Sequence, residues 1–260
     1  MKTEYRNLLQ ETKEKYEGNV FKSNRYGDFI VLEANAANDI TIEFKNTGYK
    51  ATVFLTQVNN GSITDHSAKL ILGVGIVGSK LSKEERKDKV YRNWCQILKR
   101  CYSEKIKYKR PTYDGCTMSD NFKYYPYFKE WYMSQKNWNN PDFVLDKDLL
   151  SEKHVKIYSE DTCVFLPKEI NSLLTTTKAS RGDLPIGVCK PRGNRASFRA
   201  CICKNSKNFE LGYYPTPEEA FYAYKIARED YLKEKANQWK DMLDERAYNA
   251  LYNYQVEITD

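Results

Sequence analysis

The stretch Tyr91-Arg-Asn-Trp94-Cys-Gln-Ile97-Leu98-Lys-Arg-Cys101-Tyr102 has the most regular apolar pattern in this sequence. Its apolar residues, together with Val90 just before it, recur at intervals of three and four. That spacing lines one face of an α-helix, so the stretch predicts an amphipathic helix with a buried side. This helix is the first element of residues 91–167, which we interpret as the central module of the chain.

Four further features follow the helix within this segment. First comes a basic stretch with a tyrosine, residues 105–111, which we expect to be a loop. A Tyr-Asp-Gly-Cys turn at 113–116 precedes a second helix, whose aromatic residues have helical spacing and are expected to be mostly core. These are Tyr124, Tyr127, Phe128, Trp131 and Tyr132. The segment closes with Leu145-Asp146-Lys147-Asp148 and, at 158–167, with a run that contains Thr162 and Cys163.

This order of elements resembles the His-Asn-His (HNH) endonuclease module of bacteriophage proteins and homing endonucleases. The resemblance implies a ββα module, association with DNA, and Mg²⁺ or Mn²⁺ as cofactor if the protein cuts. In that family a histidine after the aspartate of the first strand acts as general base, and an asparagine lies near the closing strand. Lys147 and Thr162 occupy those positions here. A lysine ammonium is a poor base near neutral pH, so we expect a degenerate nuclease site.

Asp146, Asp148 and His154 are the remaining catalytic candidates. The two carboxylates are two residues apart, so in an extended strand they would point to the same side and could bind Mg²⁺. The alternative is that one aspartate shapes a turn and the other pairs with Lys147. His154 is either an exposed loop residue or a catalytic group in a rearranged site.

Residues 184–236 have the pattern of a small sheet followed by a helix. Strands are predicted at 186–188, 197–204 and 209–214, with a hairpin turn at 205–208. Thr216-Pro217-Glu218-Glu219 has the residues of a helix N-terminus: a threonine cap, proline at the first position and glutamate three residues after the cap. The expected buried stripe of the helix is Ala220, Ala223, Tyr224, Ala227 and Tyr231.

This unit looks like the Apetala/ethylene-response-factor type DNA-binding domain, which phage HNH homing endonucleases often carry. The resemblance implies a three-stranded sheet that lies in the major groove, with outward arginines that contact bases and phosphates. Phe198 and Ala200 should face the helix, which directs Arg199 outward. Arg192 and Arg195 lie in the first turn of the unit, where they could also reach DNA.

The net charge of +7 is concentrated in two blocks. Residues 78–115 hold twelve Lys/Arg against five acids, and residues 178–204 hold seven against Asp183 alone. Such blocks are typical of a polyanion footprint, although ordinary solvated faces are the alternative. Tyr108 within the first block could stack on a base or sugar. The candidate DNA-binding residues are Arg100, Lys105, Lys107, Lys109, Arg110, Arg181, Arg192, Arg195, Arg199 and Lys204.

The expected fold class is α+β with several domains. Residues 1–77 contain a short helix and four strand-like runs, at 29–32, 40–44, 51–55 and 70–72, which predict a small β-barrel-like module or a curled sheet. The glycines of 73–78 lack the context of a phosphate loop and are interpreted as a flexible exit. The predicted order is completed by a charged linker at 78–90, the HNH-like module at 91–174, a linker at 175–183, the DNA-binding domain at 184–236 and a C-terminal helix at 237–260.

Composition narrows the class of protein further. No apolar run is long enough to span a membrane, and the N-terminus lacks the apolar core of a signal peptide, so we expect a cytoplasmic protein. If it is encoded by a phage, that compartment is the cytoplasm of the host. The seven cysteines form no C-x-x-C pair, and reduced thiols without bound zinc are the expectation. A zinc site from Cys101, Cys116 and Cys163 is the alternative.

The leading functional hypothesis is binding of double-stranded DNA by a phage-encoded protein with a degenerate HNH site. No small-molecule substrate is expected. One alternative is an active metal-dependent HNH homing-type endonuclease. A second is an interaction protein that binds a host protein through the N-terminal β-module.

Overall fold

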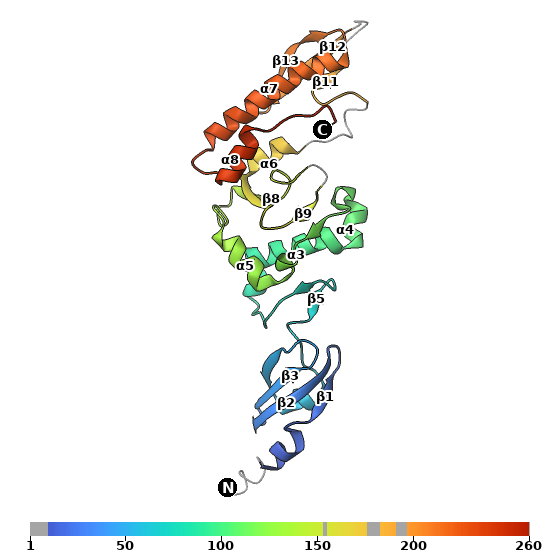
Figure 1. The fold of residues 1–260 in the computed structure, drawn as a ribbon, viewed down its shortest axis with the longest axis vertical. Coiled ribbons are helices and arrows are strands. Elements are labelled where there is room, and N and C mark those ends of the chain that lie inside the picture. The colour runs from blue at the N-terminus through green and yellow to red at the C-terminus, as the bar shows by residue number, and fades with distance from the viewer. Residues whose placement is uncertain (1–9, 153–154, 176–182, 191–196, 260) are drawn as a thin grey trace. The chain divides into compact units, whose positions relative to one another are not determined.

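The computed structural model describes residues 10–152, 155–175, 183–190 and 197–259. It is a mixed α+β structure with several small sheets, as the sequence predicts (Figure 1). The chain divides into two compact units, Met1–Lys129 and Glu130–Asp260, and this division falls inside one helix, α5 (Tyr125–Ser134).

The first sheet is a four-stranded antiparallel meander with the order β1-β2-β3-β4. Its strands are β1 (Val20–Ser23), β2 (Gly27–Ala36), β3 (Asp39–Phe44) and β4 (Lys50–Val53). The expected barrel is wrong: the sheet is open, because β1 and β4 are its two edges and do not pair with each other within the described residues. The inward residues of β2 and β3, such as Phe29, Ile40 and Ile42, form its core.

Two segments after this sheet differ from the prediction. Leu55, expected to end a strand, instead begins helix α2 (Leu55–Asn60). The glycine run expected to be a flexible exit contains strand β6 (Gly75–Ile76), which pairs with β5 (Lys69–Ile71). Gly75 packs so tightly that an added Cβ would lie 2.6 Å from Cδ1 of Leu98. The glycine there reflects close packing and not flexibility.

Helix α3 (Lys89–Tyr102) confirms the prediction made from its apolar spacing. The residues that it buries are those named from the sequence: Val90, Trp94, Ile97, Leu98 and Cys101. The Asp88 side chain caps the helix by accepting a hydrogen bond from the Val90 N–H. Trp94 is fully buried, and its Nε1–H donates to the carbonyl oxygen of Phe122 at 2.7 Å. The helix is therefore tied to the segment that leads into α5.

The basic stretch after α3 is also helical, as α4 (Glu104–Lys109), so the expected loop is wrong. The other elements of this unit are short: residues 10–16 are helical, and η1 (Glu85–Lys87), η2 (Pro111–Tyr113), β7 (Thr117–Met118) and η3 (Asn121–Lys123) follow. Of the aromatic residues named for α5, Phe128 and Tyr132 are buried, whereas Tyr124 and Tyr127 are exposed. The prediction of a mostly buried aromatic helix was therefore only partly correct.

We expect the first unit to lose stability in mild acid because of the environment of His66. Its side chain packs edge-on against the Tyr49 ring, and its Nδ1 is buried with no hydrogen-bond partner among the described residues. Burial lowers the pKa of His66, and the positive charge of Arg86 lowers it further. Stability is therefore lost as pH falls from about 6.5, the unfolded value, through the lower folded pKa. Thermal unfolding from pH 7 to 5 should show a smaller decrease in Tm for His66→Phe than for the wild type; equal decreases would contradict this.

The second unit contains a hairpin-like pair followed by a helix. Strands β8 (Phe143–Asp146) and β10 (Val164–Pro167) pair antiparallel, and α6 (Lys168–Leu174) follows directly. Strand β9 (Ile157–Tyr158) lies in the connection between them. Val164, Leu166 and Ile170 share one core with residues of the C-terminal helices.

A second antiparallel sheet has the order β11-β12-β13 and packs against helix α7 (Pro217–Gln238) (Figure 1). Its strands are β11 (Val188–Cys189), β12 (Phe198–Lys204) and β13 (Lys207–Tyr214). The predicted N-terminus of α7 is confirmed: Pro217 is its first residue, and the Thr216 hydroxyl accepts a hydrogen bond from the Glu219 N–H at 3.2 Å. Ala200, Ile202 and Tyr224 are buried between the sheet and the helix.

The end of the chain is less helical than expected. Helix α7 continues to Gln238, and α8 spans only Glu245–Tyr252, with the Asp244 side chain as its cap. Residues 256–258 are in neither a helix nor a strand, although they fall within the predicted helix. Leu243 and Leu251 join the core that α6 and α7 form, so this segment packs on the preceding helices.

Candidate nucleic-acid interface

The outer face of the β11–β13 sheet is defined by the alternation of residues along β12. Ala200 and Ile202 are buried against α7, whereas Arg199 and Cys201 are half-buried and Cys203 is exposed. The predicted direction of these side chains is therefore confirmed. Alternation follows from the period of two along a strand, which sends neighbours to opposite faces.

Arg199 is the cation at the centre of this outer face. Its Nη1 lies 3.7 Å from a carboxylate oxygen of Glu210, which is a long ion pair. Its Nε is buried, and no hydrogen-bond partner is found for it in the part of the chain that the structure describes. A guanidinium has five N–H donors, so most of the donor capacity of Arg199 is not used by Glu210.

Glu210 and Tyr213 face outward beside Arg199, and the sequence reasoning did not find them. Glu210 is paired with Cys201, whereas Tyr213 is paired with Arg199, because the register of β12 and β13 shifts between Ala200 and Cys201. The Tyr213 hydroxyl donates to Glu210 at 3.1 Å. Simple alternation places two residues three apart on opposite faces, so only the glycine at 212, with a φ of 135°, hints at the irregularity.

Lys204, a further DNA-binding candidate on β12, lies on the helix side of the sheet. Its Nζ is 5.2 Å from the centre of the Tyr231 ring of α7. The same period of two that directs Arg199 outward directs Lys204 toward α7. Lys204 and Arg199 therefore lie on opposite faces of the sheet.

The two aspartates at the end of β8 do not form a convergent pair. Strand β8 ends at Asp146, whose carboxylate accepts hydrogen bonds from the N–H groups of Asp148 and Leu149 at 2.9 and 2.8 Å. Asp148 is exposed and pairs with the ammonium of Lys147. Burial raises the pKa of Asp146, while the Leu149 hydrogen bond lowers it. The geometry matches the alternative of a turn aspartate and a lysine-paired aspartate.

Lys147 and Thr162, which occupy the positions where the HNH resemblance implies a histidine and an asparagine, are both buried. The Lys147 ammonium pairs with Asp148 and lies 5.6 Å from the centre of the Tyr158 ring. The Thr162 hydroxyl donates to the Ile157 carbonyl at 2.7 Å and accepts from the Ser159 N–H at 3.1 Å. Both side chains are therefore engaged in contacts that hold the loop between β8 and β10.

The first basic block contributes an exposed group on α4. Lys105 and Lys109 are exposed and lie one helical turn apart, and the Tyr108 side chain is 88% exposed. Arg110 is exposed at the end of the helix. Two other candidates have protein partners: Lys107 pairs with Glu104, and the Arg100 guanidinium lies 5.3 Å from the centre of the Tyr113 ring.

Four candidates, His154, Arg181, Arg192 and Arg195, lie outside the described residues. The proposed zinc ligands Cys101, Cys116 and Cys163 are buried. Burial raises the pKa of the Cys163 thiol to about 12. Among the residues that the structure describes, no three His, Cys, Asp or Glu side chains form a group that could hold a metal ion.

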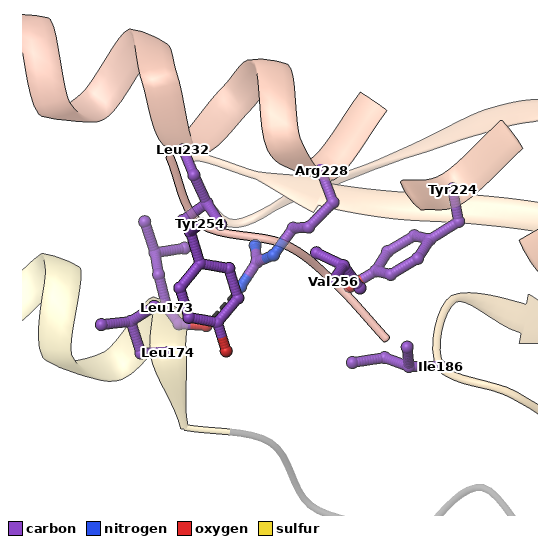
Figure 2. Close-up of a pocket in the computed structure, with 8 residues that line it drawn as sticks. All are labelled: Leu173, Leu174, Ile186, Tyr224, Arg228, Leu232, Tyr254 and Val256. Atoms are coloured by element: carbon purple, nitrogen blue, oxygen red, sulfur yellow. Dashed lines mark hydrogen bonds between the residues drawn. The ribbon is translucent and has the colours of Figure 1, made fainter. Parts of the chain in front are cut away.

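A small pocket lies between the end of α6, α7 and the C-terminal segment (Figure 2). Its free volume is about 10 Å³, room for roughly one water molecule. Figure 2 shows the Arg228 side chain reaching across it to donate to the carbonyl oxygen of Leu173. Since that bond satisfies an end carbonyl of α6, we assign the pocket a packing role.

Comparisons of the chain with protein-family models, with curated proteins and with solved structures found no match. Among the described helices, none combines the length and the apolar character needed to cross a membrane.

Proposed function

We propose that this protein binds double-stranded DNA, and that it is a phage-encoded protein built on an HNH scaffold with a degenerate nuclease site. The observation that carries the proposal is Arg199, part-exposed on the outer face of a three-stranded antiparallel sheet packed on α7. The resemblance to the Apetala/ethylene-response-factor type domain implies this combination of sheet, helix and outward arginine.

The chemistry of Arg199 suits a nucleic acid. Its planar guanidinium can donate two parallel hydrogen bonds to a phosphate or to the acceptor edge of guanine. The ion pair with Glu210 is long, and Glu210 is itself about half exposed, so exchange for a phosphate costs little. The negative charge of Glu210 also repels DNA phosphates. The affinity of this face for DNA should therefore be modest unless Arg192 and Arg195 contribute.

The exposed cations of α4 would add contacts that do not depend on DNA sequence. Lys105 and Lys109 have no ion pair among the described residues, and the Tyr108 side chain is exposed on the same helix. Lysines at this spacing suit the phosphates of one backbone, and each contact releases counterions from the DNA. Binding should therefore weaken steeply as salt is raised.

Replacing Arg199 and Arg195 should weaken binding without unfolding the protein. The expected result for Arg199→Ala, and more strongly for Arg195→Ala with Arg199→Ala, is a higher Kd for a labelled mixed-sequence duplex at about 150 mM salt. The slope of log K against log salt should fall by about 1 for each arginine that bound a phosphate in the wild type. Arg246→Ala on α8 removes the same charge outside this sheet and should leave both quantities unchanged.

Two results would count against the proposed surface. An unchanged Kd in the double variant would remove the sheet from the DNA-binding surface. A large fall in Tm would show that the arginines serve the fold, and the change in affinity would then say nothing about direct binding. Thermal unfolding is therefore measured on each variant before its titration.

The arrangement around Lys147 supports binding without cleavage. Hydrolysis of a phosphodiester needs a base that activates water and ligands that hold a divalent cation. Lys147 is buried against Asp148 and Tyr158, and Asp146 accepts hydrogen bonds from its own turn. Lys147, Asp148 and Asp146 therefore contact neighbouring groups of the same loop, and they do not surround a common site for a metal ion or a water molecule.

We expect no nicking of supercoiled plasmid by the wild-type protein in Mg²⁺ or Mn²⁺. Asp146→Ala and Asp148→Ala are run beside it, since an active site would need at least one of these carboxylates. Robust nicking by the wild type that both substitutions abolish would establish the endonuclease instead. Nicking that both variants retain would indicate a contaminating nuclease, and the assay would be repeated after further purification.

A further inference from the structure

Cys189 and Cys201 lie side by side on the outer face of the β11–β13 sheet. In the register of β11 and β12, Cys189 is opposite Arg199, so Cys201 is its diagonal neighbour on the same face. The two sulfur atoms are 3.3 Å apart, and both thiols are free. This separation is shorter than the usual contact of two non-bonded sulfur atoms and longer than a disulfide bond of about 2.05 Å.

The two strands already hold the backbone in place for a bond. The Cys201 N–H donates to the Gly187 carbonyl at 2.9 Å, and Val188 and Ala200 between them are anchored in the core against α7. The sulfur atoms need to approach by only about 1 Å more to reach bonding distance.

Accessibility separates this pair from the buried cysteines, and the close sulfur–sulfur contact separates it from Cys95, which is also half-buried. Both thiols of the pair are half-buried, so a small solute can reach them. Cys101, Cys116 and Cys163 are buried. Cys203 is exposed on the same face of β12, two residues beyond Cys201, and so lies further from Cys189. Cys189 and Cys201 are therefore both accessible to a small solute and close enough to each other to react.

We propose that Cys189 and Cys201 are a redox pair that closes to an intramolecular disulfide on exposure to a small disulfide such as glutathione disulfide. The inference does not depend on DNA binding. Closure links β11 to β12 across the face that carries Arg199, so the oxidised sheet is held more rigidly than the reduced one.

The reaction consumes one glutathione disulfide and releases two glutathione thiols. The Cys189 thiolate attacks one sulfur of glutathione disulfide, forms a mixed disulfide and expels the other half as a thiolate. The Cys201 sulfur, after losing its proton to solvent, attacks the Cys189 sulfur, and the bond to the second glutathione breaks. Two electrons pass to glutathione, and the two thiol protons end on its two released thiols.

The order of attack follows from the surroundings of Cys201. Burial and the neighbouring Cys189 raise the pKa of Cys201 to about 11, although the charge of Arg199 opposes the increase. Cys201 is therefore a poor first nucleophile, and it reacts once the mixed disulfide lies beside it. Closure should be slow near pH 7 and faster at higher pH.

The test is a redox titration of the full chain in glutathione buffers of increasing oxidised fraction. After an acid quench, the protein is unfolded and alkylated, and the number of blocked thiols is read from the intact mass. Wild type should lose two alkylation sites together, and a peptide map should show residues 189 and 201 joined. Oxidised wild type should also have a higher Tm than reduced wild type, because the link constrains the unfolded chain.

Matched serine variants assign the bond. Cys189→Ser and Cys201→Ser should each prevent the loss of two sites, whereas Cys203→Ser should behave as wild type. The proposal is overturned if wild type keeps all its alkylation sites at the most oxidising ratio. It is equally overturned if the map shows Cys203 in the bond, or if oxidation yields only covalent dimers or glutathione adducts.

Discussion

Gly187→Ala is expected to unfold the β11–β13 sheet and to abolish DNA binding with it. Gly187 has a φ of 77°, in the left-handed region that residues with a Cβ adopt at a cost of about 1–2 kcal/mol. A Cβ there would lie 2.1 Å from ring carbons of Tyr224. No real contact is that short, so either the ring or the strand must move.

Neither partner has room to give way. Tyr224 is 6% exposed and packs with Val188 and Ala200 in the core of the sheet and helix. The Gly187 carbonyl is held by the Cys201 N–H. Overpacking a filled core costs about 1–3 kcal/mol and occasionally more, in addition to the backbone strain. A loss of roughly 4 kcal/mol is a large part of the stability of a small unit.

The control for Gly187→Ala is Gly115→Ala. Gly115 has a φ of 73°, but an added Cβ there would meet nothing within 4 Å. It therefore introduces similar backbone strain without the clash. Denaturant unfolding should show a much larger loss for Gly187→Ala than for Gly115→Ala, together with loss of salt-dependent DNA binding. Equal losses in the two variants would mean that the Tyr224 ring accommodates the methyl group.

The elements that the sequence predicted well are those governed by local rules. The apolar spacing of α3 identified each residue that the helix buries, and Thr216 and Pro217 marked the beginning of α7. Both signals depend on residues within one or two helical turns. Alternation along β12 placed Arg199 outward for the same reason.

The features that the sequence missed depend on contacts between distant residues. Edge pairing decides whether four strands close into a barrel, and no local pattern states which strand pairs with which. The bulge that brings Glu210 beside Arg199 comes from the pairing of β12 with β13. Likewise, the spacing of Asp146 and Asp148 suggested convergence only under the assumption of an extended chain, and β8 ends at Asp146.

A second large effect is expected at the ion pair that joins α6 to α7. The Lys235 side chain is almost fully buried, and its ammonium pairs with Glu169 and lies 5.6 Å from the centre of the Tyr231 ring. Glu169→Gln keeps the shape and the acceptor for the Trp239 Nε1–H, which lies 3.3 Å from Glu169. With that oxygen accepting from Trp239, the amide NH2 faces the Lys235 ammonium, so the substitution removes both the charge and the acceptor opposite Lys235. Breaking a buried pair from one side costs about 3–5 kcal/mol, and we expect the lower end because Glu169 is partly exposed.

Two matched variants separate charge from packing at this pair. Asp230→Asn removes the same charge from an exposed position on α7, away from the charges that act on Lys235, and should change the free energy of unfolding by less than about 0.5 kcal/mol. Glu169→Gln with Lys235→Met removes both charges and should recover most of the loss, because no buried ammonium is left unpaired. A double variant as unstable as Glu169→Gln alone would assign the loss to packing.

The same pair predicts how stability changes at high pH. Burial by itself would lower the pKa of Lys235, but the hydrogen bond and the charge of Glu169 outweigh burial and raise it. A raised lysine pKa means that the pair stabilises the fold fully below about 10.5, the unfolded value, and that this contribution is lost as pH rises through the folded pKa. The difference in unfolding free energy between wild type and Glu169→Gln should therefore shrink above that pH. A constant difference would show that the Lys235 charge is not what Glu169 stabilises.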